Sequence, residues 1–239
     1  MRVVLVTGST SGIGEATALR FAENGDAVVF NSVRSVDEGE ALAARVPGSL
    51  YVQADISDAE DCQRLVSKVL NRYGALDVLV NNAGTTKLIP HYDLAAASVD
   101  VWREIFEVNV FGTWNLSVTA MEALRASKGS IVNVSSAAGM RPTGSSIPYA
   151  ASKAAVNHMT ALLAKVVGPD VRVNAVAPGL VDTPWTAQWD TIRARVIAAA
   201  PLKRSGTPDD IADVIVMLAS TPYVTGQVVV VDGGHSLTT

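Results

Sequence analysis

Cysteine, histidine and aromatic residues are scarce in this chain, and each shortage excludes a class of site. The only cysteine among 239 residues is Cys62, so no intrachain disulfide can form, and on its expected helix Cys62 is a packing or surface residue. The three histidines, His91, His158 and His235, lack the spacing of metal ligands, and we predict no metal site. Aromatic residues make up 5% of the chain and hydrophobic residues 49%, so we expect an aliphatic core.

Basic stretches and long apolar runs are also missing. The formal net charge is −4 and no basic run occurs, which argues against nucleic acid as a partner. No stretch approaches the ~20 apolar residues of a membrane span. The first residues, Met1 to Thr7, read as a strand that leads into a glycine motif rather than as a signal peptide. We therefore expect a soluble, cytoplasmic protein with neither nucleic acid nor membrane as a partner.

Short apolar strands alternate with helical stretches along the chain. The expected strands, mostly continuous Val, Ile and Leu runs typical of a sheet covered on both faces, are Val3–Val6, Ala27–Phe30, Leu50–Gln53, Val78–Val80, Ser130–Val134, Val171–Val176 and Gln227–Val231. The expected helices include Gly14–Glu23, Asp58–Tyr73, Val101–Arg125, Tyr149–Val167 and Pro208–Leu218. This alternation predicts an α/β fold: one domain, residues 1–239, built on a doubly wound, seven-stranded parallel sheet with helices on both faces.

A proline-punctuated segment interrupts the alternation after Val176. It contains Trp185 and Trp189, and we expect it to be partly helical. Because it follows the carboxyl end of a strand, where doubly wound sheets bind ligands, residues of about 180–206 are predicted to form a substrate lid. Internal packing or a subunit contact are the alternatives for its apolar residues.

Glycines join the first strand to the first helix in the run Thr7-Gly-Ser-Thr-Ser-Gly-Ile-Gly14. Glycine at such a junction allows a tight turn and a close approach of the backbone to a pyrophosphate, whose charge then meets the N–H groups of the helix start. The spacing is Gly-x-x-x-Gly-x-Gly, and a purely structural turn is the alternative. The position between the first strand and the first helix favours a nucleotide.

Tyr149 and Lys153 lie four residues apart in Pro148-Tyr-Ala-Ala-Ser-Lys153, so both side chains leave the same face of the expected helix. A free tyrosine has a pKa of about 10. A lysine beside it, with a cationic cofactor ring nearby, would favour the phenolate and lower that pKa, which would suit Tyr149 to acid–base catalysis. From the spacing alone, two amphipathic residues on a solvated face would look the same.

The joint order of several motifs resembles the short-chain dehydrogenase/reductase family. These motifs are Thr7–Gly14, Asn81-Asn82-Ala83-Gly84, Asn109, Ser136, Tyr149-x-x-x-Lys153, Pro178-Gly179 and Val231-Asp-Gly-Gly234. Within that family the chain is similar to the compact single-domain branch that includes 3-oxoacyl-carrier-protein reductases. The resemblance implies a Rossmann fold and hydride transfer between a nicotinamide cofactor and a carbonyl or secondary alcohol. It also implies a homotetramer through the helices Val101–Arg125 and Tyr149–Val167, for which apolar residues such as Val156 and Leu163 beyond one helix face would supply surface.

The resemblance also implies four catalytic residues, Asn109, Ser136, Tyr149 and Lys153. Ser136 would orient the substrate oxygen beside Tyr149, and Ser135 is the competing choice, since alternation along a strand puts the two on opposite sides. Lys153 would lower the pKa of Tyr149 and bind the nicotinamide ribose. Asn109 would hold a water that links the lysine to solvent, or else cap an irregularity in its helix.

The implied cofactor contacts come from several strand ends. They are Gly8, Ser11, Gly12, Ile13, Gly14, Ser32, Arg34, Asp55, Ile56, Asn82, Ala83, Gly84, Tyr149, Lys153, Pro178, Gly179, Val181 and Thr183. Asp55 would lie at an adenine edge, although it could instead cap the helix that follows, a position for which Ser57 or Asp58 is better placed.

The choice between NAD and NADP depends on the end of the second strand. An acidic residue there would bind the ribose hydroxyls of NAD, and this chain has Ser32 instead. Arg34 is close enough to pair with a 2′-phosphate, whereas Ser11 stands where many NADP-preferring relatives carry a basic residue. The balance favours NADP over NAD.

The sequence therefore predicts an NAD(P)-dependent oxidoreductase for a small carbonyl or alcohol substrate. A 3-oxoacyl-carrier-protein reductase is the more specific alternative. A regulatory protein that binds the dinucleotide without turnover, and a methyltransferase with a similar glycine loop, are disfavoured because neither needs Ser136, Tyr149 and Lys153 together.

Overall fold

The computed structural model describes residues 1–238, and Thr239, the last residue of the predicted domain, lies outside them. Within the described residues seven parallel strands form one sheet, in the order β3-β2-β1-β4-β5-β6-β7. The strands are β1 (Val3–Val6), β2 (Ala27–Ser32), β3 (Leu50–Gln53), β4 (Val78–Asn81), β5 (Ser130–Val134), β6 (Arg172–Pro178) and β7 (Val228–Val231). The predicted doubly wound parallel sheet is confirmed.

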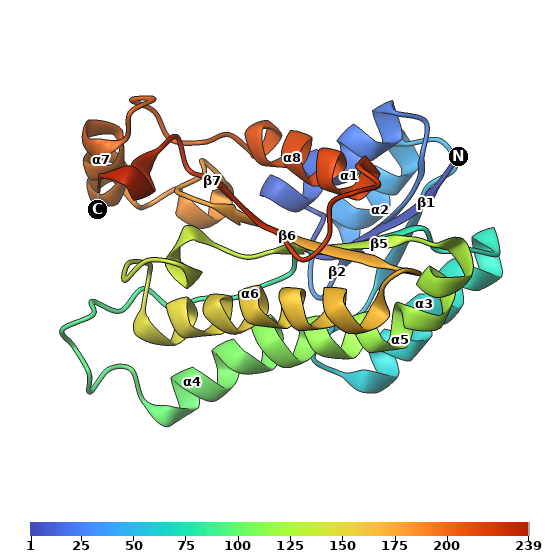
Figure 1. Ribbon diagram of the computed structural model, residues 1–239, viewed down its shortest axis with the longest axis horizontal. Coiled ribbons are helices and arrows are strands. Elements are labelled where there is room, and N and C mark those ends of the chain that lie inside the picture. The colour runs from blue at the N-terminus through green and yellow to red at the C-terminus, as the bar shows by residue number, and fades with distance from the viewer. Residues whose placement is uncertain (239) are drawn as a thin grey trace.

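Helices cover both faces of this sheet (Figure 1). On one face lie α1 (Gly12–Glu23), α2 (Val36–Arg45) and α8 (Pro208–Ser220), and on the other lie α3 (Ala59–Tyr73), α4 (Val99–Phe106), α5 (Thr113–Ser127) and α6 (Ile147–Val167). A further helix, α7 (Asp190–Ala199), stands off the sheet in the segment that was expected to be partly helical. Among residues 1–238 no helix is both long enough and apolar enough to span a bilayer.

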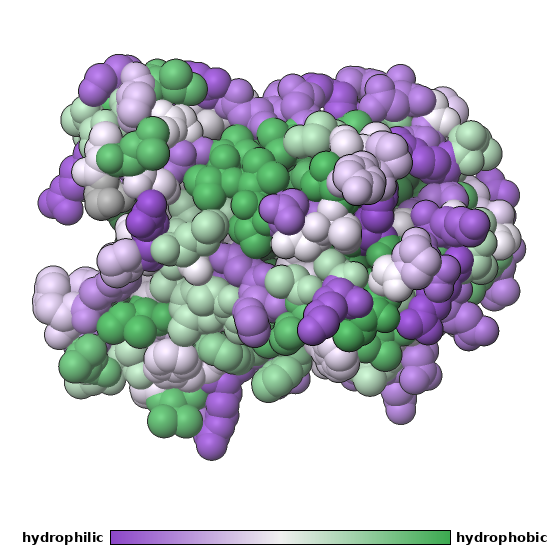
Figure 2. Space-filling view, viewed as in Figure 1, coloured by the Kyte–Doolittle hydropathy of each residue, from purple (hydrophilic) through white to green (hydrophobic). Residues whose placement is uncertain are grey.

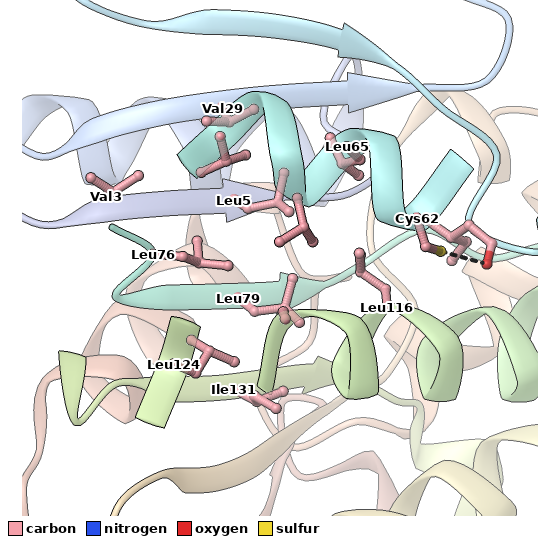
Figure 3. Packing of buried hydrophobic residues seen from close by; sticks show 14 of the residues in the cluster. Val3, Leu5, Val29, Cys62, Leu65, Leu76, Leu79, Leu116, Leu124 and Ile131 are labelled. Carbon is pink, nitrogen blue, oxygen red and sulfur yellow. Dashed lines mark hydrogen bonds between the residues drawn. The ribbon is translucent and has the colours of Figure 1, made fainter. Parts of the chain in front are cut away.

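Two aliphatic clusters form the core, one on each face of the sheet. The first packs α3, α5 and α6 against the sheet (Figure 3), and the second packs α1 and α8 against it. Cys62 belongs to the first cluster, where its thiol donates a hydrogen bond to the Ile56 carbonyl at 3.2 Å and burial raises its pKa to about 11. Its interpretation as a packing residue is confirmed. Val156 and Leu163 are also buried, so the prediction that they supply surplus surface is wrong.

The stretch predicted as one helix over Val101–Arg125 is interrupted. A π-helical turn, η1 (Glu107–Gly112), separates α4 from α5. Gly112 packs so closely on the segment after β3 that a Cβ there would lie 2.9 Å from a carbon of Ile56. The wider π turn places Asn109 inward, and π turns of this kind recur at functional sites.

The helix α2 was not among the predicted helices. Its sequence, Val36-Asp-Glu-Gly-Glu-Ala-Leu-Ala-Ala-Arg45, buries only Gly39 and Leu42, so its apolar stripe is too thin to be seen as a period. Gly39 is required by packing, because a Cβ at this position would lie 2.2 Å from the ring of Tyr51.

Candidate active site

A cleft of about 650 Å³ opens at the carboxyl ends of the strands. From β1 the chain first builds the sheet in one direction, through β2 and β3, and then crosses to β4 and builds it in the other direction. The cleft lies between β1 and β4, where the direction of the connections reverses. Figure 2 shows the surface indented on the side where α7 and the loop before α4 face each other. A cleft of this size falls within the range of small-molecule sites, about 300–1,000 Å³.

The structure brings nearly all of the predicted site residues to the wall of this cleft. The glycine loop, the ends of β2 to β6 and the start of α6 contribute Gly8, Ser11, Gly12, Ile13, Gly14, Ser32, Arg34, Asp55, Ile56, Asn82, Ala83, Gly84, Ser136, Tyr149, Lys153, Pro178, Gly179, Val181 and Thr183. Asn109 is the exception. It lies behind the wall, with 1% of its surface exposed.

The glycine loop is compressed between α1 and the end of β4. Gly8 and Gly12 have φ of 59° and 57°, which a side chain rarely adopts. A Cβ on Gly14 would lie 2.3 Å from the Gly8 carbonyl oxygen, and Asn82 holds that oxygen with its amide at 3.0 Å. The side chain of Ser11 does not cap α1, so N–H groups at the start of the helix remain for an anion. This backbone cradle fits a pyrophosphate.

The end of β2 carries Ser32 and Arg34. The Ser32 hydroxyl is already engaged, because it donates to the Ser35 carbonyl at 3.1 Å and forms a second hydrogen bond with the Tyr51 hydroxyl at 2.9 Å. Arg34 is exposed at the cleft and forms no ion pair within residues 1–238. Its guanidinium is therefore open to an anionic group.

The structure distinguishes between the two predicted roles of Asp55, a helix cap and a residue at the edge of the cofactor cleft. Asp58, not Asp55, caps α3, since it accepts hydrogen bonds from the backbone of Glu60 and Asp61. The Asp55 carboxylate accepts from the backbone and hydroxyl of Ser57 at 2.9 and 2.6 Å and faces the cleft. The alternative in which Asp55 is the helix cap is wrong.

Ser136, Tyr149 and Lys153 meet at one end of the cleft. Ser136 follows β5 with its hydroxyl near enough to the Tyr149 hydroxyl to lower the pKa of that phenol, while Tyr149 and Lys153 leave the first turns of α6. The Lys153 ammonium lies 5.7 Å from the centre of the Tyr149 ring and donates to the Val134 carbonyl at 2.9 Å. Ser135 faces away and donates to the Lys153 carbonyl at 3.1 Å. The geometry thus favours Ser136 over Ser135 as the partner of the phenol.

The pKa shifts of this pair differ from the sequence-based expectation. Removal of water from the phenol raises the pKa of Tyr149 above its usual value of about 10, and the Ser136 hydrogen bond offsets only part of that rise. Burial also lowers the pKa of Lys153 to about 8, so its positive charge is itself disfavoured. In the protein chain alone burial therefore outweighs any effect of Lys153, whose ammonium is directed to a carbonyl. The predicted lowering of the tyrosine pKa requires the cofactor ring as well, and it stays a prediction.

Asn109 ties the loop after β4 to α6. Its carbonyl oxygen accepts from the Thr85 N–H at 2.8 Å, and its amide donates to the Thr85 carbonyl and to the Ser152 hydroxyl, both at 3.0 Å. Ser152 in turn donates to the Tyr149 carbonyl at 2.7 Å. The buried amide is fully satisfied, and it fixes the backbone on both sides of the Tyr149 and Lys153 pair.

One wall of the cleft is apolar and comes from the segment after β6. Trp185, Trp189, Ile192 and Val196 line it. The Trp185 ring meets the Tyr149 ring edge-on, with 6.4 Å between their centres and 73° between their planes. These side chains face the cleft, as the lid interpretation requires.

Several cleft residues were not selected from the sequence. They include Asn31 and Val33 at the end of β2, Glu104 on α4, the loop residues Thr143, Gly144 and Ser145, and His235 near the C-terminus. Asn31 directly precedes Ser32, and its amide donates to the carbonyls of Val52 and Ala54 at 3.1 Å, so a polar residue inside an apolar strand was a usable signal. His235 reaches the cleft only through the path of the C-terminal chain, for which the sequence carries no signal.

Comparison with known proteins gives one consistent result. A family model described as enoyl-(acyl carrier protein) reductase matches residues 8–236. The chain is 55% identical over 239 residues to a Streptomyces violaceoruber protein named "Granaticin polyketide synthase putative ketoacyl reductase 2", covering 98% of this chain and 96% of the relative. It is 39% identical to the Thermotoga maritima 3-oxoacyl-(acyl-carrier-protein) reductase, covering 98% and 97%. A solved short-chain dehydrogenase/reductase of Brucella melitensis superposes with a TM-score of 0.92 at 33% identity, covering 98% and 96%.

Proposed function

The chain belongs to the short-chain dehydrogenase/reductase family of NAD(P)-dependent oxidoreductases, and we propose that Tyr149 is its general acid and base. The substrate is a small molecule with a carbonyl or a secondary alcohol group. One observation carries the proposal: Ser136, Tyr149 and Lys153 meet in the same cleft that contains a glycine cradle for a pyrophosphate.

A nicotinamide dinucleotide matches the donors along the cleft. The glycine loop holds the pyrophosphate, Asp55 and Ile56 border the adenine, and the nicotinamide end is formed by Pro178, Gly179, Val181 and Thr183, with Asn82, Ala83 and Gly84 on the adenosine side. When bound, the cofactor supplies or accepts the hydride. Lys153 binds its ribose.

The protein's own groups manage the proton. In reduction the Tyr149 hydroxyl donates its proton to the carbonyl oxygen, and in oxidation the phenolate takes a proton from the alcohol. Ser136 donates a hydrogen bond to the same oxygen and stabilises the charge that develops on it. Because desolvation raises the pKa of Tyr149, the phenol is protonated at neutral pH, which is the state that reduction needs. Asn109 holds the backbone around this pair. We propose that it also positions a water toward Lys153.

The experiment for this function is a panel of ketones, aldehydes and alcohols, each tested with NADPH, NADH and their oxidised forms. Turnover is followed by the absorbance of the reduced nicotinamide, and cofactor binding by its fluorescence. We expect substrate-dependent turnover together with cofactor binding. Absence of cofactor binding would contradict the proposal.

The more specific candidate is reduction of a 3-oxoacyl group on a carrier protein. Two relatives named as ketoacyl and 3-oxoacyl reductases favour it, and the apolar wall of Trp185, Trp189, Ile192 and Val196 suits an acyl chain. Carrier-bound and CoA-bound 3-oxoacyl thioesters in the same panel separate this candidate from a general ketone reductase. Turnover of simple ketones at equal or higher kcat/KM would favour the general activity.

We propose NADP as the preferred cofactor, with Arg34 on the 2′-phosphate. Replacement of Arg34 by Leu is expected to raise the Kd for NADPH by about tenfold, because a charge-assisted hydrogen bond is lost. The Kd for NADH should stay within about twofold, since NADH has no 2′-phosphate. The matched control is Arg45→Leu, an exposed arginine at the end of α2 that does not line the cleft. An equal loss for both cofactors would contradict the assignment.

We propose a homotetramer that buries the outer faces of α5 and α6. Phe111, Trp114 and Val118 on η1 and α5, and Leu162 and Val166 on α6, are all about half exposed or more. Apolar side chains on neighbouring helices make a surface that association would cover. Light scattering at working concentration is expected to give four chains, and a monomer would contradict the proposal.

A further inference from the structure

The chain leaves the sheet after β6 and returns before α8 beside its own starting point, and the Leu202 N–H also donates to the Gly233 carbonyl near the C-terminus at 3.1 Å. Val181 and Gly206 form a parallel bridge. The Asp182 N–H donates to the Gly206 carbonyl at 2.9 Å, and the Gly206 N–H donates to the Leu180 carbonyl at 2.9 Å. The residues between these ends, including α7, therefore form a closed loop that stands on a narrow base (Figure 1).

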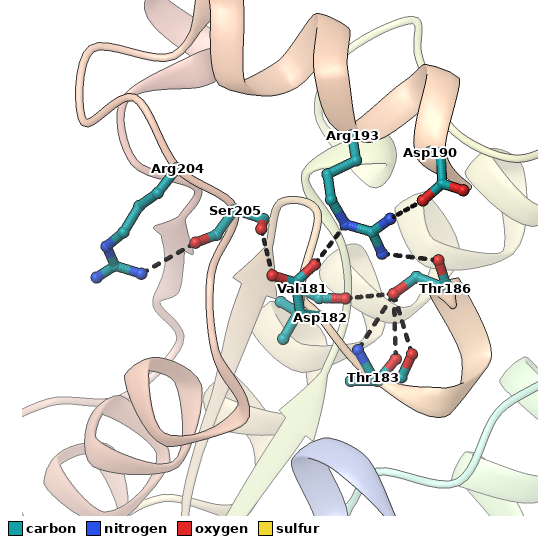
Figure 4. A network of polar contacts seen from close by, with 8 residues as sticks. All are labelled: Val181, Asp182, Thr183, Thr186, Asp190, Arg193, Arg204 and Ser205. Atoms are coloured by element: carbon teal, nitrogen blue, oxygen red, sulfur yellow. Dashed lines mark hydrogen bonds and ion pairs between the residues drawn. The ribbon is translucent and has the colours of Figure 1, made fainter. Parts of the chain in front are cut away.

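Asp182 occupies that base and binds two partners with its carboxylate (Figure 4). One oxygen accepts from Nε of Arg193 at 2.7 Å, and the other accepts from the Ser205 hydroxyl. These hydrogen bonds, with Ser205 as the larger cause, hold the pKa of Asp182 below its usual range. A single carboxylate thus joins the outgoing strand end, the returning chain and α7.

Arg193 is the contact on the side of α7. Besides Asp182, its guanidinium donates to the Thr186 carbonyl at 2.9 Å and to Asp190 at 2.8 Å, and 22% of the side chain is exposed (Figure 4). The residue just before it, Ile192, lines the cleft, and so does Val196 one turn later. Arg193 is therefore one of the contacts that hold the apolar wall beside the cleft.

The same carboxylate stands between two cofactor contacts. Val181 and Thr183, the neighbours of Asp182, line the nicotinamide end of the cleft. Thr183 also touches the glycine loop, because a Cβ on Gly12 would lie 3.1 Å from its methyl group. A ligand that orders Val181 and Thr183 also orders Asp182, and through it Arg193 and α7.

We propose that Asp182 and Arg193 are positioning residues that couple cofactor binding to the placement of the α7 wall. The inference rests on the proposed function, since it takes the ligand beside Val181 and Thr183 to be a nicotinamide dinucleotide. The coupling is reciprocal: cofactor steadies α7, and a steadied α7 binds both substrate and cofactor more tightly. Asp182 touches neither ligand in this scheme and acts only through its neighbours.

The test compares Asp182→Asn with Asp190→Asn. Both changes remove one carboxylate partner of Arg193 and the same unit of charge, and both carboxylates are substantially exposed, at 48% and 88% of the side chain. Asp190 belongs to α7 itself, so its loss cannot detach α7 from the loop after β6. The tryptic sites Arg193 and Arg195 in α7 are unchanged in both variants.

In the wild type and in Asp190→Asn, saturating NADPH is expected to slow tryptic cleavage within α7 by about tenfold. In Asp182→Asn that protection should fall below about twofold, with KM for substrate raised about tenfold and kcat changed by less than about threefold. KM is expected to rise less in Arg193→Lys than in Arg193→Met, because the lysine ammonium keeps the positive charge although it lacks the fork of donors of a guanidinium. A structural role alone would lower the melting temperature without this split between KM and kcat.

Equal protection and equal KM in Asp182→Asn and Asp190→Asn would overturn the coupling. Should Asp182→Asn fail to fold, Arg193→Met is compared with the control Arg195→Met through KM and kcat alone, because each of these changes removes a tryptic site. Arg195 is an exposed arginine of α7 that forms no ion pair within residues 1–238. Failure of the wild type to bind NADPH or NADH would instead overturn the proposed function. The two failures are therefore distinguishable by cofactor fluorescence.

Discussion

Replacement of Tyr149 by Phe is expected to lower kcat for carbonyl reduction by about 10³-fold, because a positioned general acid contributes roughly 10²–10⁴-fold. The substitution keeps the ring, and with it the edge-on contact to Trp185 at 6.4 Å, so the cleft retains its shape. Only the hydroxyl that Ser136 contacts is lost. The Kd for cofactor should stay within about threefold of the wild type.

Steady-state kinetics and cofactor fluorescence check this prediction. Tyr73→Phe is the matched control. Tyr73 lies at the end of α3, and its hydroxyl donates to the Gly48 carbonyl at 2.8 Å and does not reach the cleft. The kcat of Tyr73→Phe is expected to equal that of the wild type. If Tyr149→Phe turns over ketone at near wild-type rate, another group supplies the proton and the proposed role of Tyr149 is wrong.

Replacement of Gly14 by Ala is expected to raise the Kd for either cofactor on the order of 100-fold, which corresponds to about 2.7 kcal/mol. The new Cβ would lie 2.3 Å from the Gly8 carbonyl oxygen and 2.5 Å from the Asn82 amide nitrogen. Neither atom can give way without moving the glycine loop or the end of β4, because Asn82 is hydrogen-bonded to the carbonyls of Thr7 and Gly8. The cradle for the pyrophosphate is displaced.

Gly129→Ala separates this effect from general overpacking. A Cβ at Gly129 would lie 2.4 Å from the Asp77 carbonyl oxygen, where β5 begins and away from the cleft. Both variants are expected to lose about 1–3 kcal/mol of stability in denaturant unfolding, the usual cost of overpacking. Only Gly14→Ala should lose cofactor affinity. Equal affinity in the two variants would show that the glycine loop does not hold the cofactor.

The sheet was predictable because its strands are short, mostly apolar runs, and β1, β2, β4 and β5 are buried along their whole length. Two elements that no apolar pattern marks, α2 and η1, were not predicted. The helix α2 has charged residues on most of its surface and packs through Gly39 and Leu42, so no apolar period reveals it. The π turn η1 is equally hidden, since one extra residue in a helical turn does not disturb the apolar pattern of Val101–Arg125 enough to be seen.

The site divides in the same way. Glycine spacing and the Tyr149–Lys153 pair predicted where chemistry gathers, because those residue types have few other reasons to occur together. The burial that raises the Tyr149 pKa in the chain alone could not be predicted, since four-residue spacing tells how near two side chains are and not how much water surrounds them. The link from Asp182 to Arg193 joins residues eleven apart across a loop, and only the folded chain shows that they meet.

The burial of Lys153 has a consequence for alkaline stability. Its side chain is 5% exposed, and its pKa of about 8 lies below the ordinary lysine value of 10.5. Between these two pH values the unfolded chain carries a proton that the native chain has released, so alkali favours the native state there. Tyr149 acts oppositely above pH ~10, where unfolding frees a phenol to ionise. The residues proposed for catalysis thus give this enzyme opposing proton linkages on the basic side of neutrality.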